Sequence, residues 1–303
     1  MLLDAASLYF RAFFGVPDQR RTPDEPASNA VRGFLDMVTT LVTAHRPASL
    51  VACWDDDWRP AFRVAAIPTY KTHRLAGPDG GAEQVPDALV PQVPVIESAL
   101  AAVGIERIGC PGYEADDVIG TLATRARGRS PVRIVTGDRD LFQLVDDDAD
   151  IRVLYTAKGG VRDATVVDQA YLRSFYGVGT GDAYADLATL RGDSSDGLPG
   201  VRGIGEKTAA ELIDRYGSLN GLQAALAAGD PGLKGARRAR LLEAAEYLQV
   251  APTVVRVARD APLPEVTGAL PGTVADIRAL SELAVSHNLA GPLTRLVTAL
   301  GLV

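Results

Sequence analysis

The sequence predicts an α/β protein with a mainly parallel sheet, followed by a helical region. Short apolar runs typical of buried strands alternate with segments of helical periodicity up to about residue 155, an order characteristic of parallel β–α units. Aspartates directly follow several of these runs. After about residue 165 the strand signals fade and helical segments dominate. We therefore expect two domains, residues 1–170 and residues 171–303.

The expected strands and helices alternate along the first domain. Apolar residues at positions 31, 34, 35, 38, 41 and 42, for example, repeat with the period of a helix. The expected strands cover residues 1–6, 49–54, 105–108, 132–136 and 151–155. The expected helices cover residues 7–14, 29–44, 95–103, 115–127, 168–176, 183–190 and 208–216. Residues 15–30 are polar and rich in proline, and are expected to form a loop.

The composition indicates a globular protein that does not enter a membrane. Hydrophobic residues make up 47% of the 303 residues, and no run of 18 apolar residues is present. The N-terminus lacks the basic region of a signal peptide. Cys53 and Cys110 fit no zinc spacing and are expected to be buried free thiols, which indicates the reducing cytoplasm. The net charge of −7, taken alone, argues against a nucleic-acid partner.

Residues 58–93 form an unusually long connection between the second strand and the next helix. Connections of this length are usually functional or disordered. A basic and aromatic cluster, Tyr70-Lys71-Thr72-His73-Arg74, lies within it and precedes a Gly-rich tip at residues 77–81. The cluster is either a solvated loop or a nucleic-acid contact in which rings stack on bases and cations contact phosphates.

Three carboxylates, Glu114, Asp116 and Asp117, lie at the start of the helix expected at 115–127. Acidic residues at a helix N-terminus stabilise its dipole, so capping is one interpretation. Capping needs only one or two of them, and Glu114 and Asp117 share a helix face. A divalent cation would turn their repulsion into coordination. This segment alone leaves capping and metal binding equally open.

Further carboxylates follow the predicted strands or lie in a later loop, and they favour metal binding. Ligands of parallel sheets bind beyond the carboxyl ends of the strands. With only three histidines in the chain, oxygen ligation of Mg²⁺ or Mn²⁺ is expected rather than zinc. Nine acids exceed the needs of one ion, whereas two ions about 3.5–4 Å apart on a phosphodiester would use them. The candidate ligands are Asp4, Asp55, Glu114, Asp116, Asp117, Asp138, Asp140, Asp193 and Asp196.

The charge balance changes when this cluster is set aside. The 38 acids minus these nine leave 29, against 31 lysines and arginines, so the rest of the chain is mildly basic. Within it, Arg32 lies on the second predicted helix and faces either the site or solvent. A late basic run, Lys234, Arg237, Arg238 and Arg240, is either a solvated face or a duplex contact.

A Gly-rich segment at residues 200–209 lies between two predicted helices. Its glycines allow backbone N–H groups to approach a phosphate closely at a helix N-terminus. The pattern resembles a helix–hairpin–helix clamp on the DNA backbone, and a Gly-rich turn between helices is the alternative. The spacing and the missing preceding strand exclude a Walker phosphate loop. The residues expected to contact DNA are Gly200, Arg202, Gly203, Gly205, Lys207 and Thr208.

These motifs occur together in the order of a known family. They are the strand ending at Asp4, Trp54-Asp55, Tyr70-Lys71-x-x-Arg74, Gly112-Tyr113-Glu114-Ala115-Asp116-Asp117, Gly137-Asp138-Arg139-Asp140, and the segments 192–200 and 203–209. The chain resembles the bacterial 5′-nucleases of the flap endonuclease and 5′→3′ exonuclease superfamily. It is most similar to the 5′-nuclease domain of DNA polymerase I, and the resemblance is weakest after about residue 220.

The resemblance implies a fold and a set of residue roles. The fold is a PIN-like nuclease domain with a helical arch at about residues 58–93. A helical DNA-binding domain follows, with a helix–three-turn–helix element at about residues 186–216. Asp4, Asp55, Glu114 and Asp116 would hold a first metal ion, and Asp138, Asp140 and Asp196 a second, assisted by Asp117 and Asp193. Lys71 and Arg74, beside Tyr70, would contact the scissile phosphate, and Arg32 is a further candidate catalytic residue.

The implied activity is metal-dependent hydrolysis of DNA at 5′ flaps, nicks and 5′ ends, as in Okazaki-fragment processing and DNA repair. It would use two or more Mg²⁺ or Mn²⁺ ions, with K⁺ at the helix–three-turn–helix. DNA polymerase and ligase are the candidate partners of a cytoplasmic monomer. The chain is expected to be either a stand-alone nuclease or part of a polymerase.

The sequence departs from the family pattern in three places. Asp55 is followed by Asp56 and Asp57, so the coordinating acid is ambiguous. Ala5 stands where the family often has glycine. The Gly- and Pro-rich stretch after Lys71 predicts an arch that is partly disordered without DNA.

Three other functions fit the sequence less well. A non-catalytic DNA-structure binder would gain stability by losing the mutually repelling acids. PIN-type ribonucleases usually carry fewer acids and lack the clamp at residues 200–209. A phosphatase would need an activated nucleophile and no DNA clamp.

Overall fold

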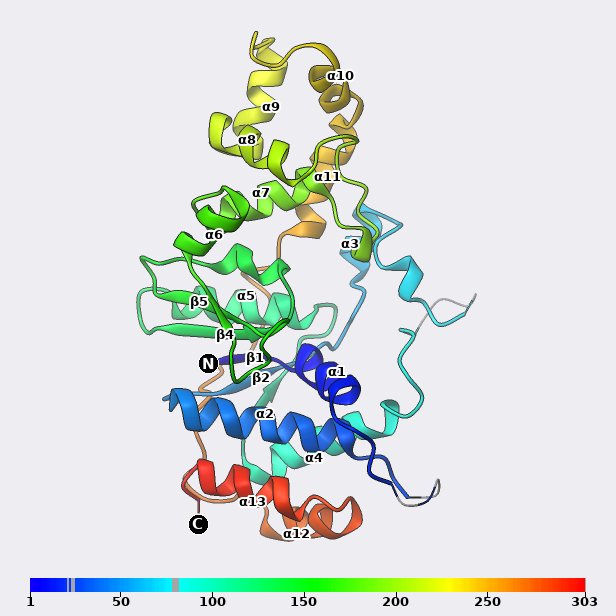
Figure 1. Ribbon diagram of the computed structural model, residues 1–303, viewed down its shortest axis with the longest axis vertical. Helices are drawn as coiled ribbons and strands as arrows, with labels where there is room; N and C mark the ends of the chain where they lie inside the picture. The colour runs from blue at the N-terminus through cyan, green and yellow to red at the C-terminus, as the bar shows by residue number, and fades with distance from the viewer. Residues whose placement is uncertain (21, 23–24, 78–81, 303) are drawn as a thin grey trace.

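The protein is built on a six-stranded sheet, seen in a computed structural model that describes residues 1–20, 22, 25–77 and 82–302 (Figure 1). The strand order is β3-β2-β1-β4-β5-β6. The first five strands are parallel and β6 is antiparallel to β5, which confirms the mainly parallel sheet. The strands are β1 (Leu2–Asp4), β2 (Val51–Cys53), β3 (Glu106–Ile108), β4 (Val132–Thr136), β5 (Ile151–Tyr155) and β6 (Thr165–Val167).

The parallel register brings the carboxyl ends of three strands to one edge of the sheet. Asp4, the last residue of β1, lies opposite Cys53 of β2. On the other side of β1, Leu3 lies opposite Val135 of β4. The residues that follow β1, β2 and β4 therefore leave the sheet side by side.

In the described part of the chain, three helices (α1, α2 and α4) lie on one face of the sheet, and two more (α12 and α13) pack on the outside of α4 and α2. The five are α1 (Ala5–Gly15), α2 (Asn29–His45), α4 (Val93–Val103), α12 (Ile277–Ser286) and α13 (Ala290–Ala299). The α2 residues predicted to share an apolar face, among them Phe34, Leu35 and Val38, are fully buried against Leu3 and Leu154 of the sheet. The helical period that predicted this segment thus also predicted its buried face.

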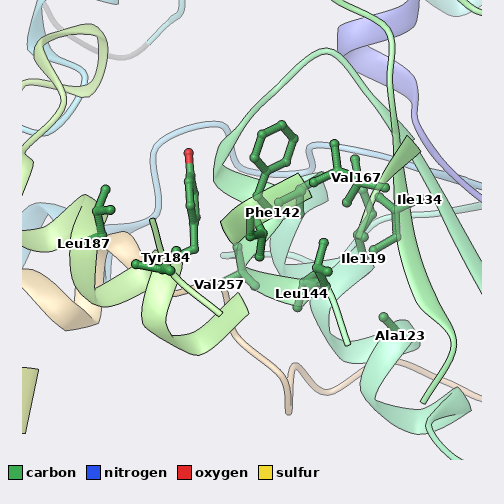
Figure 2. Packing of buried hydrophobic residues seen from close by; sticks show 14 of the residues in the cluster. Ile119, Ala123, Ile134, Phe142, Leu144, Val167, Tyr184, Leu187 and Val257 are labelled. Atoms are coloured by element: carbon green, nitrogen blue, oxygen red, sulfur yellow. The ribbon is translucent and has the colours of Figure 1, made fainter. Parts of the chain in front are cut away.

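The opposite face carries α5 (Ala115–Ala126), η3 (Asp140–Leu144), α6 (Gln169–Tyr176) and α7 (Gly181–Arg191). Phe142 of η3 is fully buried there. Its ring lies 5.0 Å from that of Tyr155 on β5 and 5.5 Å from that of Tyr184 on α7, measured between centroids. Figure 2 shows Phe142 and Tyr184 in one cluster with Ile119 and Ala123 of α5. This aromatic contact joins the sheet to the helical part of the chain.

The helical part extends away from the sheet through α8 (Glu206–Tyr216), α9 (Leu219–Ala228), α10 (Gly235–Glu243) and α11 (Ala245–Val255). The end formed by α8, α9 and α10 is the one farthest from α12 and α13 (Figure 1). After α11 the chain runs back along the molecule, where the Leu50 amide donates to the Gly268 carbonyl at 2.8 Å. Helices α12 and α13 then pack on α4 and α2. The final helices of the predicted second domain therefore lie on the first.

The long connection between β2 and α4, called the excursion here (residues 58–93), contains little regular structure. It holds α3 (Ala61–Ala66), which packs on α11, and two short 3₁₀ turns, η1 (Thr72–Arg74) and η2 (Val90–Gln92). The helical part of the expected arch is thus brief. The sequence predicted disorder in the Gly- and Pro-rich stretch after Lys71. Residues 78–81 of that stretch lie outside the described residues.

Two further sequence expectations concern the whole chain. None of the described helices is both long and apolar enough to span a bilayer. Cys53 and Cys110 are buried and free, as predicted.

Replacing Phe142 by alanine should lower the free energy of unfolding by about 3–5 kcal/mol, because a fully buried ring leaves a cavity. Denaturant unfolding followed by circular dichroism measures this change. The matched control is Phe14→Ala, whose ring is 73% exposed and whose loss should cost less than about 1 kcal/mol. Equal effects of the two changes would contradict the central position of Phe142.

Candidate active site

The carboxyl ends of β1, β2 and β4 open into a cavity of about 370 Å³. The first turns of α1 and α5 and the excursion complete its walls. Seven of the nine predicted acids line it, and Asp196 lines the space directly adjoining it, together with Glu114, Asp116, Asp138 and Asp140. The seven are Asp4, Asp55, Glu114, Asp116, Asp138, Asp140 and Asp193.

Asp4 is positioned by the junction between β1 and α1. Its side chain caps α1 by accepting from the Ser7 amide at 3.1 Å, and its second oxygen accepts from Thr136 Oγ1 at 2.6 Å. Thr136 is the last residue of β4, and its hydroxyl oxygen also accepts from the Asp138 amide at 2.8 Å. One threonine therefore fixes the acid after β1 relative to the acid after β4.

The structure separates the three consecutive aspartates after β2. Asp55 lines the cavity and accepts from the Ala115 amide of α5 at 2.8 Å. Asp56 is exposed and lies 3.5 Å from Arg107. Asp57 accepts from the Arg59 amide. Of the three, Asp55 is the one placed to bind a ligand in the cavity.

For the acids at the start of α5, the sequence left two interpretations open, helix capping and metal binding, and the acids differ in which one they fit. Glu114 and Asp117 form a capping box at the helix N-terminus. Glu114 and Asp116 line the cavity, whereas Asp117 does not. The turn thus combines a helix cap with two acids that line the cavity, and Asp117 belongs to the cap.

Asp117 is the acceptor in a fully buried ion pair with Arg63 of α3. The Arg63 Nη1 and Nη2 atoms donate to its two oxygens at 2.7 and 2.6 Å. The same oxygens accept from the Glu114 amide at 3.1 Å and from the Ala258 amide at 2.7 Å. With four donors bound, Asp117 has little capacity left for a metal ion, and its place differs from the assisting role that the resemblance implied.

Arg63 also binds the C-terminal end of α11, and its Nη2 donates to the Arg256 carbonyl just after that helix at 3.5 Å. Its Nε donates to the Val254 carbonyl at 3.1 Å, and the side chain is 2% exposed. It therefore joins the excursion, the acidic turn of α5 and the returning segment. Sequence reasoning did not identify Arg63 as a site residue; the available signal was a lone arginine within the apolar segment Ala61–Ala66.

The basic cluster of the excursion reaches the acids. Tyr70 Oη and Lys71 Nζ donate to the two oxygens of Glu114 at 2.7 and 2.8 Å. Arg74 Nη2 donates to Asp196 Oδ1 at 2.8 Å. Lys71 holds a left-handed backbone with φ of 50°, an uncommon conformation for a non-glycine residue that often marks functional positions.

The excursion also contacts the loop that carries Asp193 and Asp196. The Lys71 amide donates to the Asp196 carbonyl at 3.0 Å, and Thr69 Oγ1 donates to the Gly197 carbonyl at 3.1 Å. The cavity thus lies between the sheet edge, the excursion and this loop. Glu83, a further excursion acid that sequence reasoning did not select, lines it as well.

Burial and, after it, the crowding of acids disfavour the ionised forms of these carboxylates. Burial raises the pKa of Asp4 to about 6, against hydrogen bonds from Thr136 and Ser7 that lower it. Burial likewise raises the pKa of Asp55 to about 7, and the negative charges of Asp4 and Glu114 add to the shift. The pKa values of Asp116 and Asp140 are also raised, first by burial and then by neighbouring carboxylates.

The donor set is that of a hard divalent cation, although its members are spread around the cavity. Within the described residues, no three His, Cys, Asp or Glu side chains converge closely enough to form a finished coordination shell. Mg²⁺ usually keeps several waters and takes only one or two carboxylates directly. An open cavity lined by separated carboxylates fits that mode of binding, and a cation would relieve their repulsion.

The Gly-rich loop forms an exposed turn between α7 and α8. Gly200 and Gly203 have φ of +63° and +71°, which a side chain would strain. A Cβ at Gly200 would also collide with the backbone at Arg191 and Gly192. Of the residues predicted to contact DNA, Arg202, Gly203, Gly205 and Lys207 are exposed, whereas Thr208 is half-buried and Gly200 is buried.

Arg32 does not reach the cavity. It lies on α2, and its guanidinium donates to Gln19 at a separate surface depression shared with Ser286 and His287. The sequence left open whether Arg32 faces the site or solvent, and the structure shows it away from the acids.

Comparisons with known proteins agree with this geometry. A family model described as 5′-3′ exonuclease, N-terminal resolvase-like domain, matches residues 1–177, and one described as 5′-3′ exonuclease, C-terminal SAM fold, matches residues 180–276. The chain belongs to the 5′-3′ exonuclease family. It is therefore a hydrolytic nuclease.

Relatives support the assignment along the whole chain. A 5′-3′ exonuclease of Streptomyces coelicolor is 59% identical over 305 residues, with 99% of each chain covered. DNA polymerase I of Mycobacterium bovis is 42% identical over 224 residues, which are 73% of this chain and 23% of the polymerase. The flap endonuclease of bacteriophage T5, solved as a pseudo-enzyme-product complex with DNA and metal ions, has a TM-score of 0.63 at 15% identity, covering 99% of this chain and 98% of that one. At that identity the likeness establishes the shared fold.

Replacing Arg63 by methionine should lower the free energy of unfolding by about 3–5 kcal/mol, because it leaves the buried Asp117 charge without its partner. Denaturant unfolding measures the change. The double variant Arg63→Met/Asp117→Leu should cost less than the sum of the two single changes. The control Arg295→Met breaks an ion pair with Asp36 whose side chains are 54% and 47% exposed, and should cost at most about 1 kcal/mol. Additive costs would contradict the coupling.

In EDTA, stability should fall as pH rises from about 4 to 8. Between the ordinary carboxyl pKa of 3.8 and the raised values of about 6 and 7 for Asp4 and Asp55, the folded state binds more protons than the unfolded state. The resulting stabilisation of the folded state is therefore lost as the pH rises, at about 1.4 kcal/mol per unit of pKa shift. Thermal unfolding against pH tests this, and Asp55→Asn should flatten the decline. An unchanged slope in that variant would contradict the assignment.

Proposed function

We propose that the protein hydrolyses DNA phosphodiester bonds at 5′ flaps, nicks and 5′ ends with the help of two divalent cations, Mg²⁺ or Mn²⁺. The observation that carries the proposal is the meeting of Lys71 and Arg74 with eight carboxylates at one edge of the sheet. Carboxylates alone would repel a DNA strand. Cations on a separate segment give the same cavity a means of holding a phosphate beside bound metal ions.

Each group has a role that follows from its position. Asp4, Asp55, Glu114 and Asp116 would hold one cation, and Asp138, Asp140, Asp193 and Asp196 the other. When bound, the cations activate water and stabilise the charge that builds on the scissile phosphate. Lys71 and Arg74 would orient that phosphate, since both can exchange a carboxylate partner for a phosphate oxygen. Tyr70 fixes the orientation of Glu114 through its hydroxyl.

The proposed preference for 5′ ends and flaps is supported by the excursion, which borders the cavity opposite the sheet edge. Its contacts with Asp196 and Gly197 narrow the approach to the acids. A flexible single strand would reach the acids through this opening more easily than a duplex would. The duplex next to the cleavage point would be held by the α7–α8 loop, through the exposed backbone of Gly203 and Gly205 with Arg202, Lys207 and Thr208, while the buried Gly200 shapes the turn. A K⁺ ion at this loop would add a further contact to a phosphate.

The cellular role proposed is the removal of 5′ flaps and 5′ ends during Okazaki-fragment processing and DNA repair. The products of such cleavage are substrates for gap filling and sealing, so DNA polymerase and ligase are the expected partners. The bacterial relatives with 5′-3′ exonuclease activity in their names support this role. We expect the protein to act as a monomer on DNA in the cytoplasm.

The Asp138→Asn variant should lose flap cleavage by a factor on the order of 10² or more, while still binding the flap duplex. Asparagine is isosteric with aspartate, so the acceptor for the Asp140 amide, now Asp138 Oδ1 at 2.9 Å, would be retained. Gel analysis of a labelled 5′-flap duplex with Mg²⁺, Mn²⁺ or EDTA measures cleavage, and anisotropy measures binding. The control Asp148→Asn removes an exposed acid outside the cavity and should remain active.

Two outcomes would contradict the proposal. Tight duplex binding by the wild type without cleavage in any divalent ion would favour a DNA-structure binder. Full cleavage in EDTA would exclude the metal-dependent mechanism.

A further inference from the structure

The turn after β4 carries a cation, Arg139, to which neither the fold nor the acids beside it assign a role. Asp138, Arg139 and Asp140 all line the cavity. The arginine stands between two carboxylates in the sequence, and yet it forms no ion pair with either of them or with any other acid in the described part of the chain. Its side chain is exposed. A positive charge is therefore open to the cavity at the same turn as two of the candidate metal ligands.

Hydrogen bonds along the backbone hold this turn in place. The Asp138 amide donates to Thr136 Oγ1 at 2.8 Å, and Asp138 Oδ1 accepts from the Asp140 amide at 2.9 Å. The Arg139 carbonyl accepts from the amide of the buried Phe142 at 2.9 Å. The backbone of Arg139 is thus fixed to the sheet on one side and to the aromatic cluster on the other, which places its side chain at a defined position on the wall of the cavity.

The polar neighbours of the Arg139 guanidinium are phenol groups. Burial lowers the pKa of Arg139, but Tyr184, Tyr176 and Tyr155 outweigh burial, so the pKa is raised above its ordinary value. Tyr155 lines the cavity as well, and the rings of Tyr176 and Tyr184 lie 5.0 Å apart, measured between centroids. Phenols are neutral at pH 7. They surround the guanidinium without cancelling its charge.

Arg139 differs in this respect from the other cations that line the cavity. Lys71 and Arg74 belong to the excursion and are paired with Glu114 and Asp196, both at 2.8 Å. Arg139 belongs to the sheet edge, which borders the cavity on the side opposite the excursion. An incoming phosphate must displace a carboxylate to reach Lys71 or Arg74, whereas it can reach Arg139 directly.

We propose that Arg139 contacts the substrate, as a binding group for a DNA phosphate that adjoins the scissile one. The inference rests on the proposed function, because it adds a contact to the same substrate in the same cavity. A strand that passes between the excursion and the sheet edge meets cations on both sides. Lys71 and Arg74 take the scissile phosphate from one side, and Arg139 takes a neighbouring phosphate from the other, through the planar N–H groups with which arginine binds phosphate oxygens.

The test combines a protein change with a change in the DNA. Cleavage of a 5′-flap duplex is measured as kcat/KM at saturating Mg²⁺, with the unmodified flap and with flaps that carry a neutral methylphosphonate on either side of the scissile phosphate. Arg139→Gln should cleave the unmodified flap about 10- to 100-fold less efficiently, the effect expected for one charge-assisted hydrogen bond. At one of the two modified positions, the wild type should lose a similar factor and Arg139→Gln less than about 3-fold, because its contact is already absent.

Two further measurements separate substrate binding from support of the acids. Mn²⁺ binding without DNA, measured by titration calorimetry, should not weaken in Arg139→Gln. The matched control is Arg129→Gln, which removes the same charge from an exposed arginine that precedes β4 and does not line the cavity. This variant should cleave all three flaps like the wild type.

The inference and the proposed function fail in different ways. If Arg139→Gln cleaves the unmodified flap like the wild type, or if it loses as much as the wild type at both methylphosphonate positions, the phosphate contact is overturned and the nuclease function stands. A wild type that cleaves no flap with Mg²⁺ or Mn²⁺ would overturn both.

Discussion

The buried ion pair between Arg63 and Asp117 is the contact on which the arrangement of the site depends. It joins three segments that are far apart in sequence: the excursion, the first turn of α5 and the chain after α11. A buried arginine without its carboxylate, or the reverse, is a costly uncompensated charge, so these segments are constrained to stay together. The ion pair fixes the first turn of α5, which positions Glu114 and Asp116. It also anchors the excursion, which positions Lys71.

The site places many like charges in a small volume, and the fold offsets their repulsion in several ways. Thr136 and the amides of Ser7 and Ala115 donate to individual carboxylates, while Lys71 and Arg74 face two of them with positive charge. Burial, followed by the remaining repulsion, raises the pKa values of Asp55 and Asp116. Local instability of this kind is typical of functional sites, where stability is sacrificed for ligand binding. In the proposed function, Lys71 and Arg74, two of the groups that offset the repulsion, also hold the substrate phosphate.

Much of the parallel sheet and of its acidic edge could be predicted from the sequence, because both follow from local sequence patterns. Aspartates after buried apolar runs indicate the carboxyl edge of a parallel sheet, and Asp4, Asp55 and Asp138 lie there. Strand β6 was not predicted, because its three residues, Thr165–Val167, lie where helical segments begin to dominate the sequence. The partner of Asp117 could not be predicted, because Arg63 is brought to it only by tertiary packing. The same holds for the direction of Arg32 and for the return of α12 and α13 to the first helices, since periodicity shows that a helix has an apolar face without showing which neighbour covers it.

The central claim is that the carboxylates beyond β1, β2 and β4 form a binding site for two divalent cations. The most direct measurement is crystallographic, with Mn²⁺ located by its anomalous scattering in crystals of the protein. The account predicts two Mn²⁺ ions in the cavity, one near Glu114 and Asp116 and the other near Asp138 and Asp140. Mn²⁺ bound only elsewhere on the protein, with the cavity free of anomalous density at saturating metal, would contradict it.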